Sequence, residues 1–332
     1  MLDRAAFPRE KICGDCLNPG VWKLVEALGV REALVLAGGS PLDRVIFGEL
    51  NGRCHEVQLP DTDRPEYAVK RSILDQLLAS EAAALGADVR FNTILTSLRD
   101  EEDQWHLQTN RGKITAKCLL AADGRNSSVA SLLRLRPRRR DNRVAFQTHF
   151  HHLDYEQGTV QLHLHRDGYA GLSDVGDDVT NLCLVSHPQQ SLHIRKWAED
   201  RFCIPSTAAW RSITPIARSD IRSPYPRLLL AGDARRVVEP FTGEGIYYAL
   251  GAGTMAGKAF AAYQSGAITD ARPGYEKSLR TLYAKRLWWN RLAHLAVVQP
   301  HLGSLTFSVA SRFGWLHMLT SRVVEPQIAY AQ

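Results

Sequence analysis

The sequence has few of the features that mark secreted, membrane-spanning or unstructured chains. Its six cysteines are irregularly spaced and do not look like a disulfide framework, which favours a reducing compartment. The opening residues, MLDRAAFPREK, carry charged side chains from Asp3 onward and lack the apolar segment of a signal peptide. The net charge is only +6, with 23% charged and 45% hydrophobic residues, which excludes a disordered or collagen-like chain.

Long apolar runs are also scarce. Only residues 292–311 are long enough and free enough of charge to resemble a membrane span, and they contain Gln299, Pro300 and several other polar residues. We therefore expect a cytoplasmic protein without a transmembrane helix. The aromatic residues in and around this stretch leave one alternative, in which a C-terminal helix pair lies on a membrane or closes over an apolar substrate.

The positive charge is concentrated in residues 134–143, which hold six arginines and one aspartate. Such a run is able to bind nucleic acid or an anionic membrane. Pro137 favours a solvated loop instead, and no aromatic residue interleaves with the arginines to stack on bases. We expect no nucleic-acid partner.

The 332 residues suffice for one large or two ordinary domains. Helical spacing predicts helices over residues 19–28, 70–85, 125–133 and 190–202, and from residue 245 onward. Strand patterns occupy 89–121 and 143–186, with a buried strand at 228–234. The predicted class is α/β, or mixed α and β: a Rossmann-like unit, an inserted β-sheet, a return to the first unit, and C-terminal helices.

The strongest functional signal is LLLAGDARRVVEPFTGEGIYYAL at 228–250, where a buried strand ends at Asp233 and a glycine-rich turn, Gly243 to Gly245, begins a helix. Ligands bind at the carboxyl edge of parallel strands. An aspartate there accepts hydrogen bonds from sugar-like hydroxyls, and glycines let backbone amides approach an anion. Two weaker signals follow the same logic: LLAADGRNSS at 119–128, and Arg71 at the start of an amphipathic helix.

Four stretches together resemble FAD-dependent oxidoreductases of the aromatic-hydroxylase fold, especially the geranylgeranyl-reductase-like branch. They are FPREKICGD at 7–15, the Arg71 helix, ADGRNS at 122–127, and GDA…EPFTGEGIYYAL. The resemblance implies that Asp233 binds the FAD ribitol and that the Cys13–Gly14 loop faces the flavin ring. The cofactor-binding residues that it implies are Asp3, Arg71, Asp123, Gly124, Gly232, Asp233, Pro240, Gly243, Glu244 and Gly245. Cys13 and Tyr169 are the candidate catalytic residues, and no metal is expected.

The sequence also departs from the family. The family opens with a strand, a GxGxxG turn and a helix, whereas this chain starts at about the second strand, where Asp3 falls at the ribose-binding acid. We expect either an N-terminally truncated chain, which would bind FAD poorly or fold poorly, or a degenerate homologue. Ala130 stands where the hydroxylases usually carry an arginine. Arg235 and Arg236 stand where the family has small residues. Of the Tyr-x-Trp-x-Phe-Pro motif of the reductase branch, only Tyr169 remains.

Two further groups of residues are candidates for redox or metal chemistry. Cys13 and Cys16 form a CxxC pair, which suits a redox disulfide but lacks the second pair of a zinc ribbon. His149 and His151, with His163 and His165, would face one another if a turn near residue 158 paired their strands, and four imidazoles are able to bind zinc or copper. A polar strand face is the simpler interpretation.

The sequence thus predicts an FAD-dependent oxidoreductase of reductase type that acts on a lipophilic or aromatic small molecule, with NAD(P)H, if used, as a transient electron donor. One alternative is an aromatic-hydroxylase-type monooxygenase, and another is a flavin-free, non-catalytic remnant. The oligomeric state is left open. The predicted domains are an FAD-binding domain (1–66 and 67–142, then 219–262), a β-rich substrate domain (143–218) and a C-terminal helical region (263–332).

Overall fold

The structure is a computed structural model, and it describes the chain except residues 139, 152–154, 285, 314 and 317–332. The α-helices in this part of the chain are α1 (Gly20–Ala27), α2 (Arg31–Leu36), α3 (Arg71–Ala84), α4 (Ser128–Leu132), α5 (Ser191–Arg201), α6 (Gly245–Gln264), α7 (Arg272–Ala284), α8 (Arg286–Val298) and α9 (Pro300–Arg312). The short 3-10 helices are η1 (Pro188–Gln190), η2 (Gly232–Ala234) and η3 (Pro240–Thr242). The strands are β1 (Cys16–Leu17), β2 (Ser40–Leu42), β3 (Arg44–Gly48), β4 (Cys54–Gln58), β5 (Glu66–Ala68), β6 (Leu95–Glu101), β7 (Gln104–Thr109), β8 (Gly112–Ala116), β9 (Leu119–Ala121), β10 (Arg140–Asp141), β11 (Val144–His151), β12 (Thr159–His165), β13 (Gly168–Asp174), β14 (Val179–Ser186), β15 (Arg211–Ile213), β16 (Ala217–Arg218) and β17 (Leu228–Leu230).

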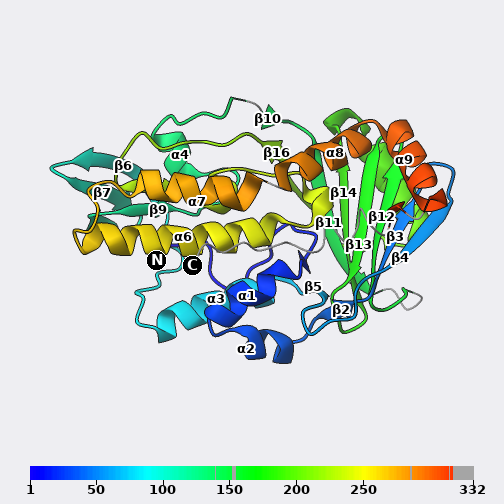
Figure 1. The fold of residues 1–332 in the computed structure, drawn as a ribbon, viewed down its shortest axis with the longest axis horizontal. Helices are drawn as coiled ribbons and strands as arrows, with labels where there is room; N and C mark the ends of the chain where they lie inside the picture. Colours follow the sequence, from blue (N-terminus) through cyan, green and yellow to red (C-terminus); the bar gives the residue numbers. More distant parts are fainter. Residues whose placement is uncertain (139, 152–154, 285, 314, 317–332) are drawn as a thin grey trace.

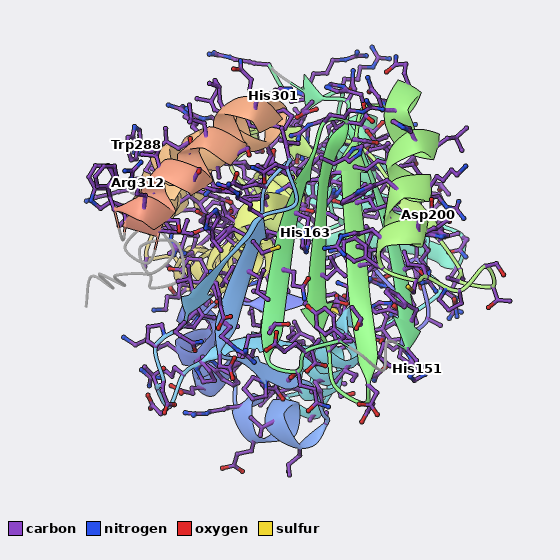
Figure 2. All side chains as sticks on the ribbon, turned by 90° about the vertical axis from the view of Figure 1, so that its right-hand side faces the viewer. His151, His163, Asp200, Trp288, His301 and Arg312 are labelled. Atoms are coloured by element: carbon purple, nitrogen blue, oxygen red, sulfur yellow. The ribbon has the colours of Figure 1, made fainter. Side chains whose placement is uncertain are left out.

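The largest sheet has seven strands in the order β15–β11–β14–β13–β12–β3–β4, and it forms one half of the molecule (Figure 1). Its neighbours pair antiparallel except β12 and β3, which are parallel. Side chains alternate between the two faces, so Leu182 and Leu184 pack with α5, whereas Val185 joins the core that includes Val297 of α8 and Phe307 of α9. Figure 2 shows the helix of His301 and Arg312 on one side of the sheet and the helix of Asp200 on the other. Helices therefore cover both faces of this sheet.

The other half is organised around two parallel strands, β9 and β17, paired from Leu119↔Leu228 to Ala121↔Leu230. Helices α6 and α7 lie side by side there (Figure 1), and the Tyr275 hydroxyl of α7 donates a 2.8 Å hydrogen bond to the Leu230 carbonyl. The carboxyl ends of both strands point to the same edge, where ligands bind in folds of this kind.

Several sequence predictions are confirmed because the local signals agree with the packing. The helix expected at 70–85 is α3, whose Leu74 is buried with α1 and α6 in one core. The turn expected between 110 and 112 joins β7 to β8. The sequence patterns do not predict helix α2. Its six residues are too few for a clear helical period, which explains why it was missed.

The idea of a four-histidine metal site is wrong. It required β11, with His149 and His151, to pair with β12, with His163 and His165. In the sheet, β14 and β13 lie between those strands. His149 instead contacts the buried Asp15, with 2.8 Å between Nε2 and Oδ2.

The pairing of β3 with β12 bears on the predicted domains, whose boundaries stay predictions. Residues 44–58 lie in the seven-stranded sheet, although the prediction grouped 1–66 with the FAD-binding unit. The last residues of the predicted C-terminal region, 317–332, lie outside the described residues. Among the described helices, none combines the length and apolar character needed to cross a bilayer.

Candidate cofactor and substrate cavity

A cavity of about 880 Å³ runs from the edge of β9 and β17 to the space between the large sheet and α8–α9. One end is charged, and its lining includes Asp3, Arg9, Lys11, Arg71, Asp75, Arg125 and Asp233. The other end is apolar, and its lining includes Val45, Phe47, Leu162, Val185, Ile216, Phe241, Leu295, Leu302 and Phe307. A single space thus offers both a polar and an apolar compartment.

Two turns at the strand ends form part of the charged end. Arg125 follows β9, Asp233 follows β17, and Arg125 Nη2 lies 3.3 Å from Asp233 Oδ2. The Nε of Arg125 is buried and has no hydrogen-bond partner among the described residues. Because a buried donor without a partner costs free energy, this nitrogen favours a ligand that accepts a hydrogen bond.

More cations gather where α3 begins. The Arg71 guanidinium binds the Asp75 carboxylate through contacts of 2.7 to 3.0 Å, and Arg9 lies 3.3 Å from the same carboxylate. The charge of Arg71, together with burial, lowers the pKa of nearby Lys11 to about 8. An anion would relieve this repulsion, so the cluster suits a phosphate or another anionic group.

The loop that carries Cys13 is held rigidly against the large sheet. The Cys13 carbonyl accepts hydrogen bonds from Gln147 Nε2 at 2.8 Å and Asn181 Nδ2 at 2.9 Å, and a third from the Cys183 thiol. Burial raises the pKa of the Cys13 thiol, partly offset by the charge of Arg71. Cys13 and Cys16 are both free thiols, so the structure holds no disulfide in the CxxC pair.

The glycine-rich turn joins η3 to α6 and faces the cavity. Gly243 has φ of 67°, a conformation that glycine adopts without strain. Glu244 is buried and is not part of the cavity lining, and its carboxylate binds Arg286 and Asn290 of α8 and Thr242. Burial raises the pKa of Glu244 in spite of these contacts. The carboxylate therefore anchors the turn to the C-terminal helices.

A second buried carboxylate, Glu66, lines the cavity from β5. Only 8% of the residue is exposed, and its Oε2 has no hydrogen-bond partner among the described residues. Burial raises the pKa of Glu66 to about 8, which favours the protonated acid at neutral pH.

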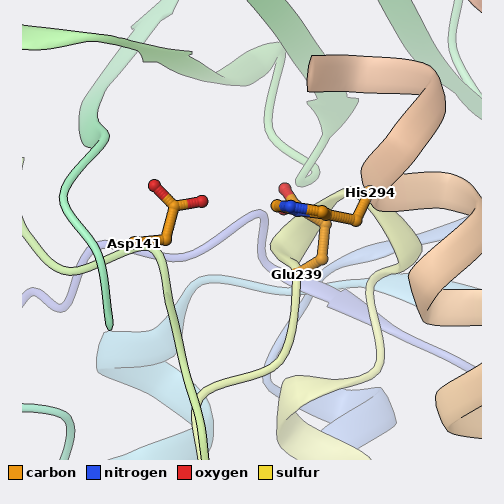
Figure 3. Close-up of side chains that lie close together, drawn as sticks. All are labelled: Asp141, Glu239 and His294. Atoms are coloured by element: carbon orange, nitrogen blue, oxygen red, sulfur yellow. The ribbon is translucent and has the colours of Figure 1, made fainter. Parts of the chain in front are cut away.

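A third buried carboxylate, Glu239, lies just before η3. It accepts a 2.8 Å hydrogen bond from the Tyr169 hydroxyl, and its Oε2 lies 2.7 Å from His294 Nδ1. Asp141, Glu239 and His294 lie close together (Figure 3), with ligand atoms within 4.8 Å of one another. The guanidinium of Arg143 already contacts both carboxylates, at 2.7 Å and 2.5 Å. The guanidinium would repel a metal cation at this position, so we assign no metal to the cluster.

The helices α8 and α9 close the apolar end and also expose apolar side chains outward. Large apolar residues on or just after these helices that are at least two-fifths exposed are Trp288, Leu292, Leu295, Val298, Leu302, Leu305, Val309, Phe313 and Trp315. Leu292, Leu295 and Leu302 also line the cavity. We call this set the α8–α9 apolar surface. It is continuous with the cavity lining.

Comparison with known proteins identifies the family. The family described as "FAD binding domain" matches residues 1–202, which is more than half of the chain. The chain belongs to this FAD-binding-domain family. The resemblance seen in the sequence is therefore confirmed at the level of the family.

Two reductases are among the relatives of this family member. The chain is 28% identical to a digeranylgeranylglycerophospholipid reductase of Methanothermobacter thermautotrophicus, over 68% of this chain and 61% of that protein. It is 25% identical to the menaquinone reductase of Mycolicibacterium smegmatis, over 98% of this chain and 84% of that protein. The chain thus spans less than two thirds of the archaeal relative.

Solved structures show the same fold at low sequence identity. A flavin-dependent brominase matches with a TM-score of 0.78 at 16% identity, over 99% of this chain and 89% of that one. A flavoprotein/dehydrogenase from Cytophaga hutchinsonii matches with a TM-score of 0.72 at 18% identity, over 84% of this chain and 75% of that one. The mixed α/β class with a cofactor-binding unit, an inserted sheet and C-terminal helices is thereby confirmed.

The cavity fits the cofactor that the family name implies. Gly14, Gly124 and Gly245 line it, and a Cβ added at any of the three would meet no atom within 4 Å. Their backbones therefore border open space, as a flat ring or a phosphate requires. The partnerless Arg125 nitrogen and the crowded cations at α3 add donors and positive charge beside that space.

The structure brings most of the predicted site residues to this cavity. The lining contains Asp3, Arg71, Gly124, Gly232, Asp233, Pro240, Gly243 and Gly245, together with the catalytic candidates Cys13 and Tyr169. Asp123 and Glu244 are not in the lining. The Asp123 carboxylate accepts a hydrogen bond from the backbone of Val129 in α4. The cofactor contacts and catalytic roles of all these residues stay predictions.

Sequence reasoning missed several residues of the cavity. Arg125 lay inside the quoted ADGRNS motif, and Lys11 inside FPREKICGD, so their motifs could have indicated them. Glu239 lay inside the quoted EPFTGEGIYYAL stretch, although it is not part of the cavity lining. Glu66, which lines the cavity, and His294, which lies beside Glu239, had no such signal, because isolated acids and histidines are ordinary on any surface. Only their burial and contacts in three dimensions reveal them.

Proposed function

We propose that this chain is a flavin-dependent reductase that adds hydrogen to a lipophilic small molecule. The observation that carries the proposal is the single cavity that joins a charged, glycine-lined end to an apolar end under α8–α9. The names of the two reductase relatives, which specify a glycerophospholipid and a quinone, support a lipophilic substrate.

In this proposal, FAD lies at the charged end. Asp233 would hold the ribitol hydroxyls, and Arg71, Lys11 and Arg125 would supply positive charge near anionic groups. The Cys13–Gly14 loop and the Gly243–Gly245 turn would border the ring. When bound, the flavin supplies hydride chemistry. The protein positions the substrate against the ring, excludes water with the apolar end, and supplies a proton.

We propose NAD(P)H as a transient electron donor, on the basis of the family resemblance alone. Anaerobic mixing with NADH or NADPH tests this, because a productive donor bleaches the flavin absorbance. A protein that only dithionite reduces would require another donor.

We also propose that the α8–α9 apolar surface rests on a lipid surface. Arg291 and Arg312 are exposed on the same helices, and cations of this kind are attracted to anionic headgroups. Figure 2 shows Trp288 and Arg312 at the outer edge of these helices, away from the sheet. Because part of this surface lines the cavity, a lipid would reach the apolar end without crossing water.

The test is a single-turnover reaction. Protein reduced anaerobically with dithionite is mixed with vesicles that contain menaquinone or a digeranylgeranylglycerophospholipid. Reoxidation of the flavin with a product that has gained two hydrogen atoms supports the reductase. A product that has gained an oxygen atom, with oxygen consumed, would identify the monooxygenase alternative. Protein that takes up no flavin would favour the non-catalytic alternative.

A further inference from the structure

A buried chain of hydrogen bonds links the cavity to the molecular surface. Tyr169 lines the cavity, and its hydroxyl donates to Glu239 Oε1 at 2.8 Å. Glu239 Oε2 lies 2.7 Å from His294 Nδ1. Tyr169 and Glu239 are 3% and 4% exposed, whereas the His294 side chain is 37% exposed. The three residues thus span from the cavity wall to solvent with no gap longer than a hydrogen bond (Figure 3 shows Glu239 and His294).

We infer that Tyr169, Glu239 and His294 form a proton relay that supplies the cavity from solvent. The inference rests on the proposed function, because each hydride delivered to a substrate must be matched by one proton. That proton needs a route into the cavity, and this chain of contacts offers one.

In this relay, each proton transfer has a named donor and acceptor. The His294 imidazolium gives its Nδ1 proton to Glu239 Oε2 and is reprotonated by solvent. The neutral Glu239 carboxyl rotates and gives that proton to Tyr169 Oη, while Tyr169 gives its own hydroxyl proton to the substrate anion. One proton would leave solvent and one would reach the substrate, and a bound, reduced flavin would supply the two electrons as hydride.

The groups around Glu239 keep it ionised at rest. Arg143, Tyr169 and His294 contact its carboxylate, Arg143 Nη2 also lies 3.3 Å from His294 Nδ1, and an Asp141 carboxylate oxygen lies within 4.8 Å. Burial alone would raise the pKa of Glu239, but the His294 hydrogen bond and the Arg143 charge outweigh it and lower the pKa. Glu239 is therefore a hydrogen-bond acceptor at rest, and in the relay it holds the proton only transiently between His294 and Tyr169.

The same contacts have a structural explanation, which the experiment must separate from a relay. Glu239 directly precedes η3, and the rings of Tyr169 and Phe241 contact at 5.2 Å, so the network also holds the glycine-rich turn against β13. A merely structural network would affect flavin retention and folding. It would leave the solvent isotope effect and rescue by added base unchanged.

The test compares Tyr169→Phe, Glu239→Gln and His294→Ala with the wild type in the single-turnover reaction with menaquinone vesicles. His301→Ala, on an exposed histidine of α9, is the matched control. We expect the relay variants to retain flavin and to lose on the order of 10²-fold in rate, because removal of a proton-transfer group has effects of this size. We also expect a larger solvent deuterium isotope effect, and partial rescue of His294→Ala by imidazole. His301→Ala should react like the wild type.

Several outcomes overturn the relay. It fails if Glu239→Gln and His294→Ala react at wild-type rates, if imidazole does not rescue His294→Ala, or if slow variants are slow only because they have lost flavin. If the wild type itself does not reduce either lipid, the proposed function fails instead. The relay is then judged by exchange of the Glu239 carboxyl proton for deuterium, followed at its infrared band, which Glu239→Gln must abolish. A relay predicts exchange that His294→Ala slows and His301→Ala does not, and equal exchange rates in these variants would overturn the relay independently.

Discussion

Arg125 Nη2 lies 3.3 Å from Asp233 Oδ2, and this contact joins the ends of two parallel strands that are more than a hundred residues apart in sequence. The pair forms where β9 and β17 stop, at the edge of the cavity. Each partner keeps bonding capacity for a ligand: Asp233 is part-exposed to the cavity, and Arg125 retains a partnerless buried nitrogen. The two short sequence motifs therefore act as one binding feature.

Replacement of Asp233 tests the assigned cofactor end. We expect Asp233→Ala to lower FAD affinity about tenfold to a hundredfold, because hydrogen bonds to a charged group contribute roughly 1.5–3 kcal/mol. Fluorescence quenching of FAD on titration with protein measures the change. Asp61→Ala, which alters an exposed loop aspartate, is the control and should leave affinity unchanged. Equal affinities for wild type and Asp233→Ala would contradict the site assignment.

Lys11 makes cofactor affinity depend on pH. The charge of Arg71 and burial lower the Lys11 pKa to about 8, so the lysine loses its proton as pH rises from 7 to 9. An anionic cofactor binds the charged lysine better, so we expect affinity for FAD to fall over this window. Lys11→Met should bind more weakly at pH 7 and show a flatter profile. Lys23→Met, on an exposed lysine of α1, should keep the wild-type profile. A wild-type affinity that rises toward pH 9 would argue against this role.

Glu66 should make stability fall with rising pH. Burial raises its folded pKa to about 8, above the ordinary value of 4.5, so the folded state binds more protons than the unfolded state between these values. Stability from this group is present below pH 4.5 and is lost as pH rises toward 8, at up to ~1.4 kcal/mol per pH unit.

Glu66→Gln keeps the shape and removes this titration. Urea unfolding at pH 5 and pH 8 should show that the variant gains stability relative to wild type at pH 8. A constant difference between the two proteins at both pH values would mean that Glu66 is ionised in the folded state.

The α8–α9 apolar surface predicts vesicle binding. We expect Leu305→Glu to lower partitioning onto anionic vesicles more than tenfold, because burial of a leucine side chain contributes about 1.5–3 kcal/mol. Leu305 is 60% exposed, and Leu192, which is 83% exposed on α5, provides the control Leu192→Glu. Co-sedimentation measures both. Equal loss in the two variants would show that this surface is not the docking face.

The sequence predicted the charged, glycine-lined end of the cavity better than the apolar end, for a physical reason. The turns at Asp233 and Gly243 depend on local residue types, so a short sequence motif is enough to predict them. Strand β17 occupies 228–230, inside the predicted strand 228–234, and the glycine-aspartate pair that follows it lies in η2.

The apolar end is built by contacts between distant segments. β3 pairs with β12 across more than a hundred residues, and no local pattern specifies that pairing. Likewise Glu239 and His294 meet only because α8 packs beside η3, 55 residues further along the chain. The four-histidine prediction failed for the same reason, because the order of strands in a sheet is a tertiary property that no local pattern specifies.

The central claim is that this cavity holds FAD, and the most direct measurement is the flavin content of the purified 332-residue chain after incubation with excess FAD and gel filtration. Absorbance, and release of the flavin on denaturation, give the stoichiometry. The account predicts one FAD per chain, lost on gel filtration of Asp233→Ala. A folded chain that carries no FAD would contradict it.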